Sequence, residues 1–283
     1  MTLKSDPGNF FEDFVVGDEL IHATPRTVTE ADAALYTGLT GSRFALYSAD
    51  TFAQDCGLPS APLDPLLAFH VVFGKTVPDI SLNAVANLGY ADGRFLSPVF
   101  PGDTLRAVSE VIGVKENSNG KTGVVWVRTR GYNQENDEVL SYVRWVMVNK
   151  KDPSHPAPKA VVPELPQVVD PKELPERSLD GAEYNFVLAG SPFGFEDYEI
   201  GEKIDHVDAV TVEEAEHQIA TRLYQNTAKV HFNQYAQAQT PRGKRLIYGG
   251  VAISLARSLT FNGLANAQMM VALNAGAHAN PCF

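Results

Sequence analysis

The sequence has few cysteines, no long apolar run and fewer basic than acidic residues, and each shortage excludes a class of protein. Only Cys56 and Cys282 are present, in unrelated surroundings, so we expect neither a disulfide framework nor a cysteine metal site. No run approaches the roughly 18 apolar residues that a membrane span needs. Residues 1–7 lack the apolar segment of a signal peptide, so a cytoplasmic protein is expected. The formal net charge of −11 argues against nucleic acid or a membrane as partner.

What the chain does contain is an internal repeat. Residues 11–17 (FEDFVVG) return as residues 195–201 (FEDYEIG), 184 positions later, and residues 27–32 (TVTEAD) return at the same spacing as residues 211–216 (TVEEAE). A repeat at so long a period indicates two related domains rather than a stack of small units. The length of 283 residues, with 44 % hydrophobic and 20 % charged residues, fits two globular domains.

A proline-rich segment separates the two repeats. Seven prolines lie between positions 153 and 175, where a helix cannot form and extended backbone is favoured. We therefore divide the chain into a first repeat at 1–150, a linker at 151–185 and a second repeat at 186–283.

Each repeat is predicted to be an α+β domain. Residues 65–75 are apolar nearly all round, which is typical of a buried helix, and residues 249–259 are their counterpart in the second repeat. Thr29 and Thr211 precede acidic residues and are candidate helix N-caps. Residues 105–114, 124–133 and 139–148 are rich in valine, threonine and aromatics, and turn residues separate them. This order predicts an antiparallel sheet wrapped round a central helix.

The second repeat stops short of the first. Residues 101–150 of repeat 1, which hold its three predicted strands, have no counterpart in repeat 2. A sheet without those strands would leave an unpaired edge. We expect the natural protein to continue beyond Phe283, and the alternative is a half-domain that another subunit completes.

A short motif in repeat 2 connects the chain to a known family. Residues 225–231 (QNTAKVH) resemble the G-D-x-N-P-L-H motif of MaoC-like R-specific enoyl-CoA hydratases, with the histidine position kept at His231 and the aspartate replaced by Asn226. Repeat 1 has Ser42 and Tyr47 at the matching positions. Segments 73–90 and 222–232 are especially similar to mesaconyl-CoA (2-methylfumaryl-CoA) hydratases.

This resemblance implies two hot-dog domains and a coenzyme A thioester substrate. It also implies a hydro-lyase that reversibly hydrates mesaconyl-CoA to β-methylmalyl-CoA, with repeat 2 catalytic and repeat 1 degenerate. Coenzyme A enters as part of the substrate, so no separate cofactor or metal is expected, and we expect a homodimer.

Two residues of the motif are the candidate catalytic pair. His231 can take and return a proton near neutral pH, as water addition requires. An amide such as Asn226 cannot ionise, so we expect it to hold the water. A carboxylate there would repel the second carboxylate of a dicarboxylic substrate. The alternatives are a structural histidine and an asparagine that caps a local turn.

Binding groups are predicted around residues 249–259. The backbone N–H groups of Gly249 and Gly250 would stabilise the enolate oxygen, although close helix packing is an equal reason for glycines. The basic residues Arg242, Lys244 and Arg245 are candidates for the coenzyme A phosphates, or are merely solvated. Arg257 is a candidate for the distal carboxylate of the substrate.

Three other functions remain open from the sequence. A hydratase for another, straight-chain enoyl-CoA would differ in the thioester that it converts. A non-catalytic acyl-CoA-binding protein would explain the missing aspartate but not the histidine. A thioesterase would release free coenzyme A.

Overall fold

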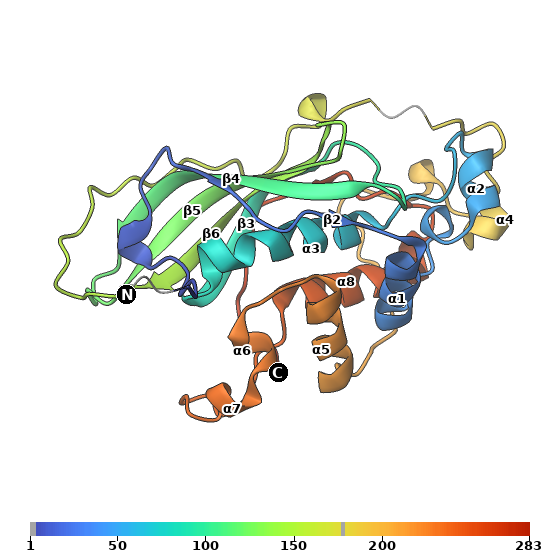
Figure 1. Ribbon diagram of the computed structural model, residues 1–283. Helices are drawn as coiled ribbons and strands as arrows, with labels where there is room; N and C mark the ends of the chain where they lie inside the picture. Colours follow the sequence, from blue (N-terminus) through green and yellow to red (C-terminus); the bar gives the residue numbers. More distant parts are fainter. Residues whose placement is uncertain (1–3, 177–178) are drawn as a thin grey trace.

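One antiparallel sheet and the helix that lies along it organise the protein (Figure 1). The computed structural model describes residues 4–176 and 179–283. The sheet follows the order β1-β4-β5-β6-β3-β7, with β2 added beside β4 and β8 beside β3. Its long strands are β3 Ala84–Phe95, β4 Thr104–Glu116, β5 Thr122–Tyr132 and β6 Glu138–Asn149. Its short strands are β1 Glu19–Ile21, β2 Arg26–Thr27, β7 Ala272–Leu273 and β8 Gly276–Ala277.

The helices lie in both repeats, and one 3-10 turn lies in the linker. Those of the first repeat are α1 Glu30–Thr40, α2 Asp50–Asp55 and α3 Pro65–Thr76, with 3-10 turns η1 Phe11–Asp13 and η2 Ala45–Tyr47 and a π-helical turn η3 Val77–Ser81. The later ones are η4 Pro171–Glu173, α4 Phe186–Ala189, η5 Phe195–Asp197, α5 Glu214–Leu223, α6 Lys229–Phe232, α7 Gln234–Gln237, α8 Gly249–Leu259 and α9 Phe261–Leu264. None of the helices in the described ranges is long and apolar enough to cross a membrane.

The structure confirms most of the predicted elements. The helix predicted at 65–75 is α3, the helix predicted at 249–259 is α8, and the three predicted strands are β4, β5 and β6. Thr29 is the N-cap of α1, with the side chain of Asp32 accepting from its backbone N–H at 2.8 Å. The prediction for Thr211 is wrong, because α5 begins later with Glu213 as its N-cap.

Strand β3 was not predicted. Its sequence is interrupted by polar residues and glycines, among them Asn87, Gly89 and Gly93, which lower its local strand propensity. The structure pairs it with β6 through three register shifts, and β7 and β8 of the second repeat pair with its other edge. Long-range pairing therefore makes a strand where local propensity is weak.

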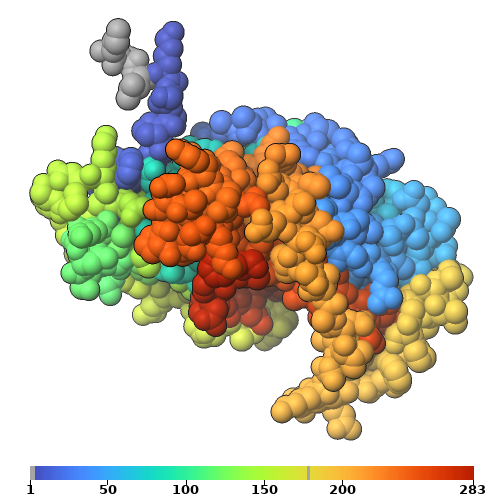
Figure 2. All heavy atoms as spheres, turned by 90° about the horizontal axis from the view of Figure 1, so that it is seen from below, coloured from blue at the N-terminus to red at the C-terminus, as the bar shows by residue number. Residues whose placement is uncertain are grey.

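The two repeats share one apolar core. Leu67 and Val71 of α3 lie in the same buried cluster as Ala220 of α5 and Leu255 of α8. In Figure 1, α8 lies below α3, which lies below the sheet. Seen from below, the segments of the second repeat cover the middle of the molecule between the strands and the N-terminal helices (Figure 2). The ends of α3 and α8 are thereby placed against residues of the other repeat.

The proline-rich linker runs along the sheet. Val161 forms an antiparallel bridge with Val114, with two N–H···O bonds of 2.9 Å. Gly113 makes room for it, because a Cβ at that position would lie 2.7 Å from Pro163. The linker is thus a strap held against β4, as its proline content predicts.

The second repeat contributes few strands within the described residues. Beyond position 179 these are β7 and β8, each two residues long, and both pair with β3 of the first repeat. The division of the chain into two repeats and a linker, and its expected continuation, stay predictions.

Candidate active site

His231 lies on the short helix α6, beside the start of α8. Its Nδ1 lies 2.9 Å from the carbonyl oxygen of Leu246, and a carbonyl can only accept, so Nδ1 carries the proton. Nε2 is then the unprotonated nitrogen, and it has no hydrogen bond to the described part of the chain. Burial lowers the pKa of His231 to about 4, and the Leu246 carbonyl offsets this only in part. The imidazole is therefore neutral at pH 7 with a free acceptor, as a general base must be.

Asn226 is buried in the turn that joins α5 to α6. Its Oδ1 accepts from the backbone N–H of Ala228 at 3.0 Å, so the side chain does cap the turn. Its Nδ2 is buried and has no partner within residues 4–176 and 179–283. Both expectations for Asn226 are therefore compatible with the structure: one end of the amide holds the loop and the other is left as a donor.

The start of α8 presents unpaired backbone donors. Within the described ranges, the N–H groups of Gly249 and Gly250 have no acceptor, whereas Val251 N–H donates to Tyr248 O at 2.9 Å. Close packing also requires the glycines. A Cβ on Gly249 would lie 2.5 Å from the ring of His278, and a Cβ on Gly250 would lie 2.5 Å from the ring of His70. Close packing and free donors are compatible reasons for glycine at these positions. Without side chains, the backbone N–H groups of Gly249 and Gly250 can also be approached by a ligand.

Four of the seven histidines surround this helix start. The Tyr248 ring lies 5.6 Å from that of His231 and 5.5 Å from that of His70, and His278 packs against Gly249. His70 is a core residue, as expected. Its Nδ1 lies 3.2 Å from Tyr248 Oη and its Nε2 lies 2.8 Å from Ser254 Oγ, and burial lowers its pKa to about 3.

His217 is a site residue that the sequence did not reveal. Its Nε2 accepts the backbone N–H of Tyr248 at 2.8 Å, and its ring lies 5.9 Å from that of His231. Burial, aided by the nearby His231 and Arg245, lowers its pKa to about 4. The one available signal was that Ala33 occupies the matching position of repeat 1. His217 fixes the turn that precedes the two glycines.

The predicted basic cluster separates into two parts. Arg245 donates to Gln218 at 2.8 Å and to Glu214 at 2.6 Å, so it ties its loop to α5. Lys244 lies over the ring of Phe283 with its Nζ 4.5 Å from the centroid, and Arg242 is exposed. Only Arg242 and Lys244 remain available for phosphate.

The hypothesis for Arg257 is not supported. Its guanidinium lies 3.7 Å above the ring of Phe44 and donates to Thr260 Oγ1 at 3.1 Å and to the carbonyl of Ala267. It stands eight residues after Gly249, about 12 Å along the helix axis. Helical periodicity predicts the position of Arg257 along the helix but not the residues that it contacts. Arg257 joins α8 to the first repeat.

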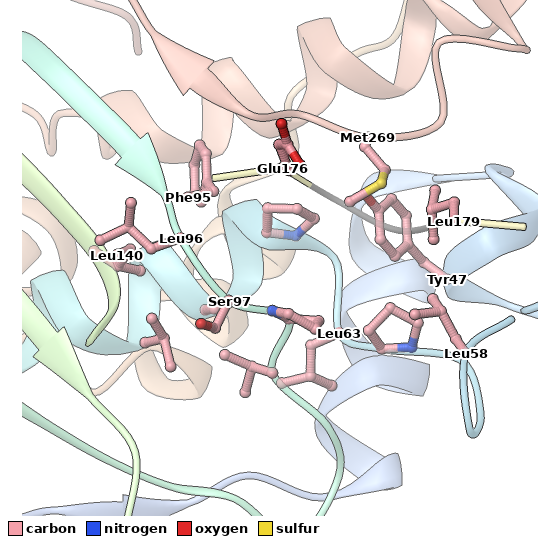
Figure 3. A pocket seen from close by; sticks show the side chains of 16 residues that line it. Tyr47, Leu58, Leu63, Phe95, Leu96, Ser97, Leu140, Glu176, Leu179 and Met269 are labelled. Atoms are coloured by element: carbon pink, nitrogen blue, oxygen red, sulfur yellow. The ribbon is translucent and has the colours of Figure 1, made fainter. Parts of the chain in front are cut away.

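The matching place in repeat 1 is an apolar cavity of about 230 Å³ (Figure 3). It is lined by Tyr47, Leu63 and Pro65, whose counterparts 184 residues later are His231, Ile247 and Gly249. Figure 3 shows Leu63 and Leu140 among its mostly apolar side chains. The first repeat therefore has an apolar cavity at this place, with Tyr47 and Ser42 at the positions of His231 and Asn226.

Comparison with known proteins shows the family of the chain. The family model for mesaconyl-CoA hydratase matches residues 2–262. A protein of Cereibacter sphaeroides named mesaconyl-CoA hydratase is 65 % identical over 283 residues, which are 99 % of this chain and 81 % of that protein.

The chain belongs to the mesaconyl-CoA hydratase family. Another relative, the β-methylmalyl-CoA dehydratase of Chloroflexus aurantiacus, is 60 % identical over all of this chain and 81 % of its own length. A crystal structure from the same organism, described as a MaoC domain dehydratase, superposes with a TM-score of 0.97 over the same shares at 60 % identity. A double hot-dog protein of Mycobacterium tuberculosis has a TM-score of 0.74 at 23 % identity, covering 97 % of this chain and 82 % of its own. The fold is a double hot-dog.

Proposed function

We propose that this member of the family is a hydro-lyase that reversibly adds water to mesaconyl-CoA to give β-methylmalyl-CoA. Its relatives carry these two activities as their names. The observation that carries the proposal is the pairing of a neutral histidine and a helix start. His231 has a free Nε2, and the adjacent N–H groups of Gly249 and Gly250 have no acceptor in the described residues.

His231 performs the proton transfers. Its Nε2 takes a proton from water as the water oxygen bonds to C3 of the enoyl thioester. The electrons of the C2–C3 double bond move toward C2 and the thioester oxygen, which gives an enolate. The imidazolium then returns its proton to C2. The sum is one water added across the double bond, and the same steps reversed give dehydration.

Gly249 and Gly250 stabilise the enolate. Backbone N–H groups at a helix start point outward and carry the positive end of the helix dipole. Donors fixed in advance at the atom where charge develops lower the barrier without reorganisation. His217 holds the preceding peptide, so the two free donors keep their direction.

Asn226 and the exposed basic residues complete the assignment. The unpaired Nδ2 of Asn226 donates to the oxygen of the attacking water, and it brings no charge near a dicarboxylic acyl group. Arg242 and Lys244 bind the coenzyme A phosphates. The reaction needs no cofactor beyond the coenzyme A of the substrate.

The test is to incubate the protein with mesaconyl-CoA and with crotonyl-CoA, following enoyl absorbance and product mass. We expect mesaconyl-CoA to gain the mass of one water, with little or no conversion of crotonyl-CoA. Faster conversion of crotonyl-CoA would contradict the dicarboxylic substrate, and free coenzyme A as the main product would indicate a thioesterase. The cytoplasmic location and the homodimer stay predictions, which cell fractionation and sedimentation would check.

A further inference from the structure

Arg144, on the inner face of β6, is a fully buried cation without an acidic partner. Its side chain has 0 % exposure. Nη2 donates to Thr76 Oγ1 at 2.9 Å, Nη1 donates to Ser81 Oγ at 3.4 Å, and the guanidinium lies 4.4 Å above the ring of Phe73. Nε has no acceptor, and no carboxylate pairs with this arginine anywhere in residues 4–176 and 179–283.

Such an arrangement is costly in a folded protein. A charge removed from water normally has a counter-ion, and an uncompensated one destabilises the fold. Lys150 shows the usual solution in this chain, because its buried Nζ lies 2.7 Å from Glu116. Burial lowers the pKa of Arg144, but a guanidinium stays protonated at pH 7. A buried cation without a counter-ion in the chain is therefore suited to bind the anionic group of a ligand.

Two short routes of contact lead from Arg144 to the active site. Arg144 pairs in register with Tyr90 of β3, whose ring lies 5.5 Å from that of His278, and His278 packs against Gly249. On the other side Phe73, under the guanidinium, lies 5.2 Å from the ring of Tyr248. Two chains of side-chain contacts thus connect Arg144 to the start of α8.

The proposed substrate has an anionic group close to its reacting carbons. In mesaconyl-CoA the second carboxylate is attached to C3, the carbon that water attacks, and only the double bond and one single bond on either side separate it from the thioester. When the thioester oxygen lies at Gly249 and Gly250, the carboxylate lies only a few bonds away.

We propose that Arg144 binds the distal carboxylate of the substrate and thereby selects dicarboxylic over monocarboxylic enoyl thioesters. This inference rests on the proposed function. A planar guanidinium matches a carboxylate with two parallel hydrogen bonds. The unpaired Nε is one donor of such a fork. Arg144 takes the part that the sequence suggested for Arg257, and it acts as a specificity residue rather than in proton transfer.

Arg144→Met tests the proposal in the full chain, because methionine fills similar space without charge. Mesaconyl-CoA is measured as substrate and crotonyl-CoA as a competitive inhibitor. The inhibition constant of crotonyl-CoA can be measured even if the protein does not convert it. We expect kcat/KM for mesaconyl-CoA to fall about 10²-fold or more, the scale for losing one partner of a buried charge pair. The inhibition constant of crotonyl-CoA should change less than about threefold, since this ligand has no carboxylate to lose.

Arg106→Met is the matched control. Arg106 also stacks on an aromatic ring of the sheet, 4.3 Å from the centroid of Tyr132, but outside the cluster around Arg144. It should leave both constants unchanged. Arg144→Lys keeps a charge and covers the case in which the methionine variant does not fold. It should lower kcat/KM for mesaconyl-CoA selectively, but by less than Arg144→Met does.

The outcomes separate the two claims. Equal losses for both thioesters in folded Arg144 variants would overturn the inference and leave the proposed function standing. So would a selective loss in Lys75→Met instead, because Lys75 is, like Arg144, a buried cation without an acidic partner in the described residues; it is 3 % exposed and its Nζ donates to Gln225. Failure of the unaltered protein to hydrate mesaconyl-CoA would contradict the proposed function itself.

Discussion

The central helices of the two repeats begin in opposite ways. At the start of α3, Pro65 has no N–H to offer, and the N–H of Leu66 is taken by Asp64 Oδ1 at 2.9 Å. At the matching start of α8, Gly249 and Gly250 have N–H groups without an acceptor in the described chain. One helix start is closed by its own residues, and the other is left open.

The difference shows how the repeats have diverged. An acidic N-cap followed by proline is a good stabilising start for a helix, with the cap contributing about 1 kcal/mol. The start of α8 forgoes that stabilisation, and His217 holds only the peptide before it. Repeat 1 thus lacks both the free N–H groups at its helix start and the histidine, and it has an apolar cavity beside Tyr47.

His231→Ala should have the largest effect. Loss of a general acid–base group lowers turnover by about 10²–10⁴-fold. Binding of the thioester should change little, because the coenzyme A moiety lies away from the reacting carbons. Tyr47→Phe, at the matching place in repeat 1, is the control and should keep near-normal turnover. Steady-state kinetics on mesaconyl-CoA check both, and full activity without the imidazole would refute the mechanism.

Gly250→Ala tests the open helix start. The added methyl would meet the rings of His70 and Tyr248 at 2.5 Å. Such overpacking costs about 1–3 kcal/mol and displaces the donors, so kcat/KM should fall about ten- to a hundredfold. Gly38→Ala is the control in the first repeat, because nothing lies within 4 Å of a Cβ there. It should raise stability by about 0.5–1 kcal/mol with unchanged kinetics, and equal behaviour of the two variants would be evidence against a special start of α8.

Asn226→Asp should have a smaller and selective effect. The carboxylate can still accept from Ala228 N–H, so the turn persists, but it cannot donate at the Nδ2 position. Its charge would oppose the substrate carboxylate. We expect kcat/KM for mesaconyl-CoA to fall about tenfold while crotonyl-CoA is spared or improved, on the scale of one weakened polar contact. Equal losses on both thioesters would make Asn226 structural only.

Acid should destabilise the protein through its buried histidines. The folded pKa values of His70 and His217 are lowered to about 3 and about 4, below an unfolded value near 6.5, so the unfolded state binds more protons as pH falls. Stability is complete above about pH 6.5, and on the order of 1–2 kcal/mol per histidine is lost by pH 5. Denaturant unfolding at both pH values checks this. The His70→Gln variant should lose less free energy of unfolding between neutral pH and pH 5 than the unaltered protein. An equal loss would mean that groups other than His70 cause the acid sensitivity.

Turnover should resist acid more than stability does. The low pKa of His231, about 4, places the acidic limb of the kcat/KM profile near that pH rather than near 6.5. Short assays that end before unfolding measure it. A limb at pH 6–7 would mean that another group is the base.

Much of the fold was predictable because its main elements carry strong local signals. The apolar run at 65–75 and the valine-rich segment at 105–114 were assigned correctly, since burial dictates both patterns. Strand β3 was missed because its glycines and polar residues suit bulges that only pairing partners reveal. Thr211 failed as a cap because two more residues stay extended before α5.

The site was predictable only where a motif lies in one segment. His231 and Asn226 are five residues apart, so the spacing of the motif identified them as candidates. His217 acts on a backbone N–H 31 residues away, and Arg144 on β6 resembles an ordinary polar strand residue in the sequence. The contacts of Arg257 with Phe44 and Thr260 could not be predicted, because spacing along a helix does not specify what lies opposite each face. Residues whose contacts are distant in the sequence, such as His217 and Arg144, have no local sequence pattern that identifies them.

One variant tests most directly whether the helix start, as well as the histidine, decides which repeat can react. In the double variant His231→Ala, Tyr47→His the histidine is moved to the repeat whose helix start is closed. Turnover of mesaconyl-CoA by this variant is the quantity to measure. We predict that it stays as low as in His231→Ala, because Pro65 and the capped Leu66 supply no free donor. Recovery of turnover would contradict the account.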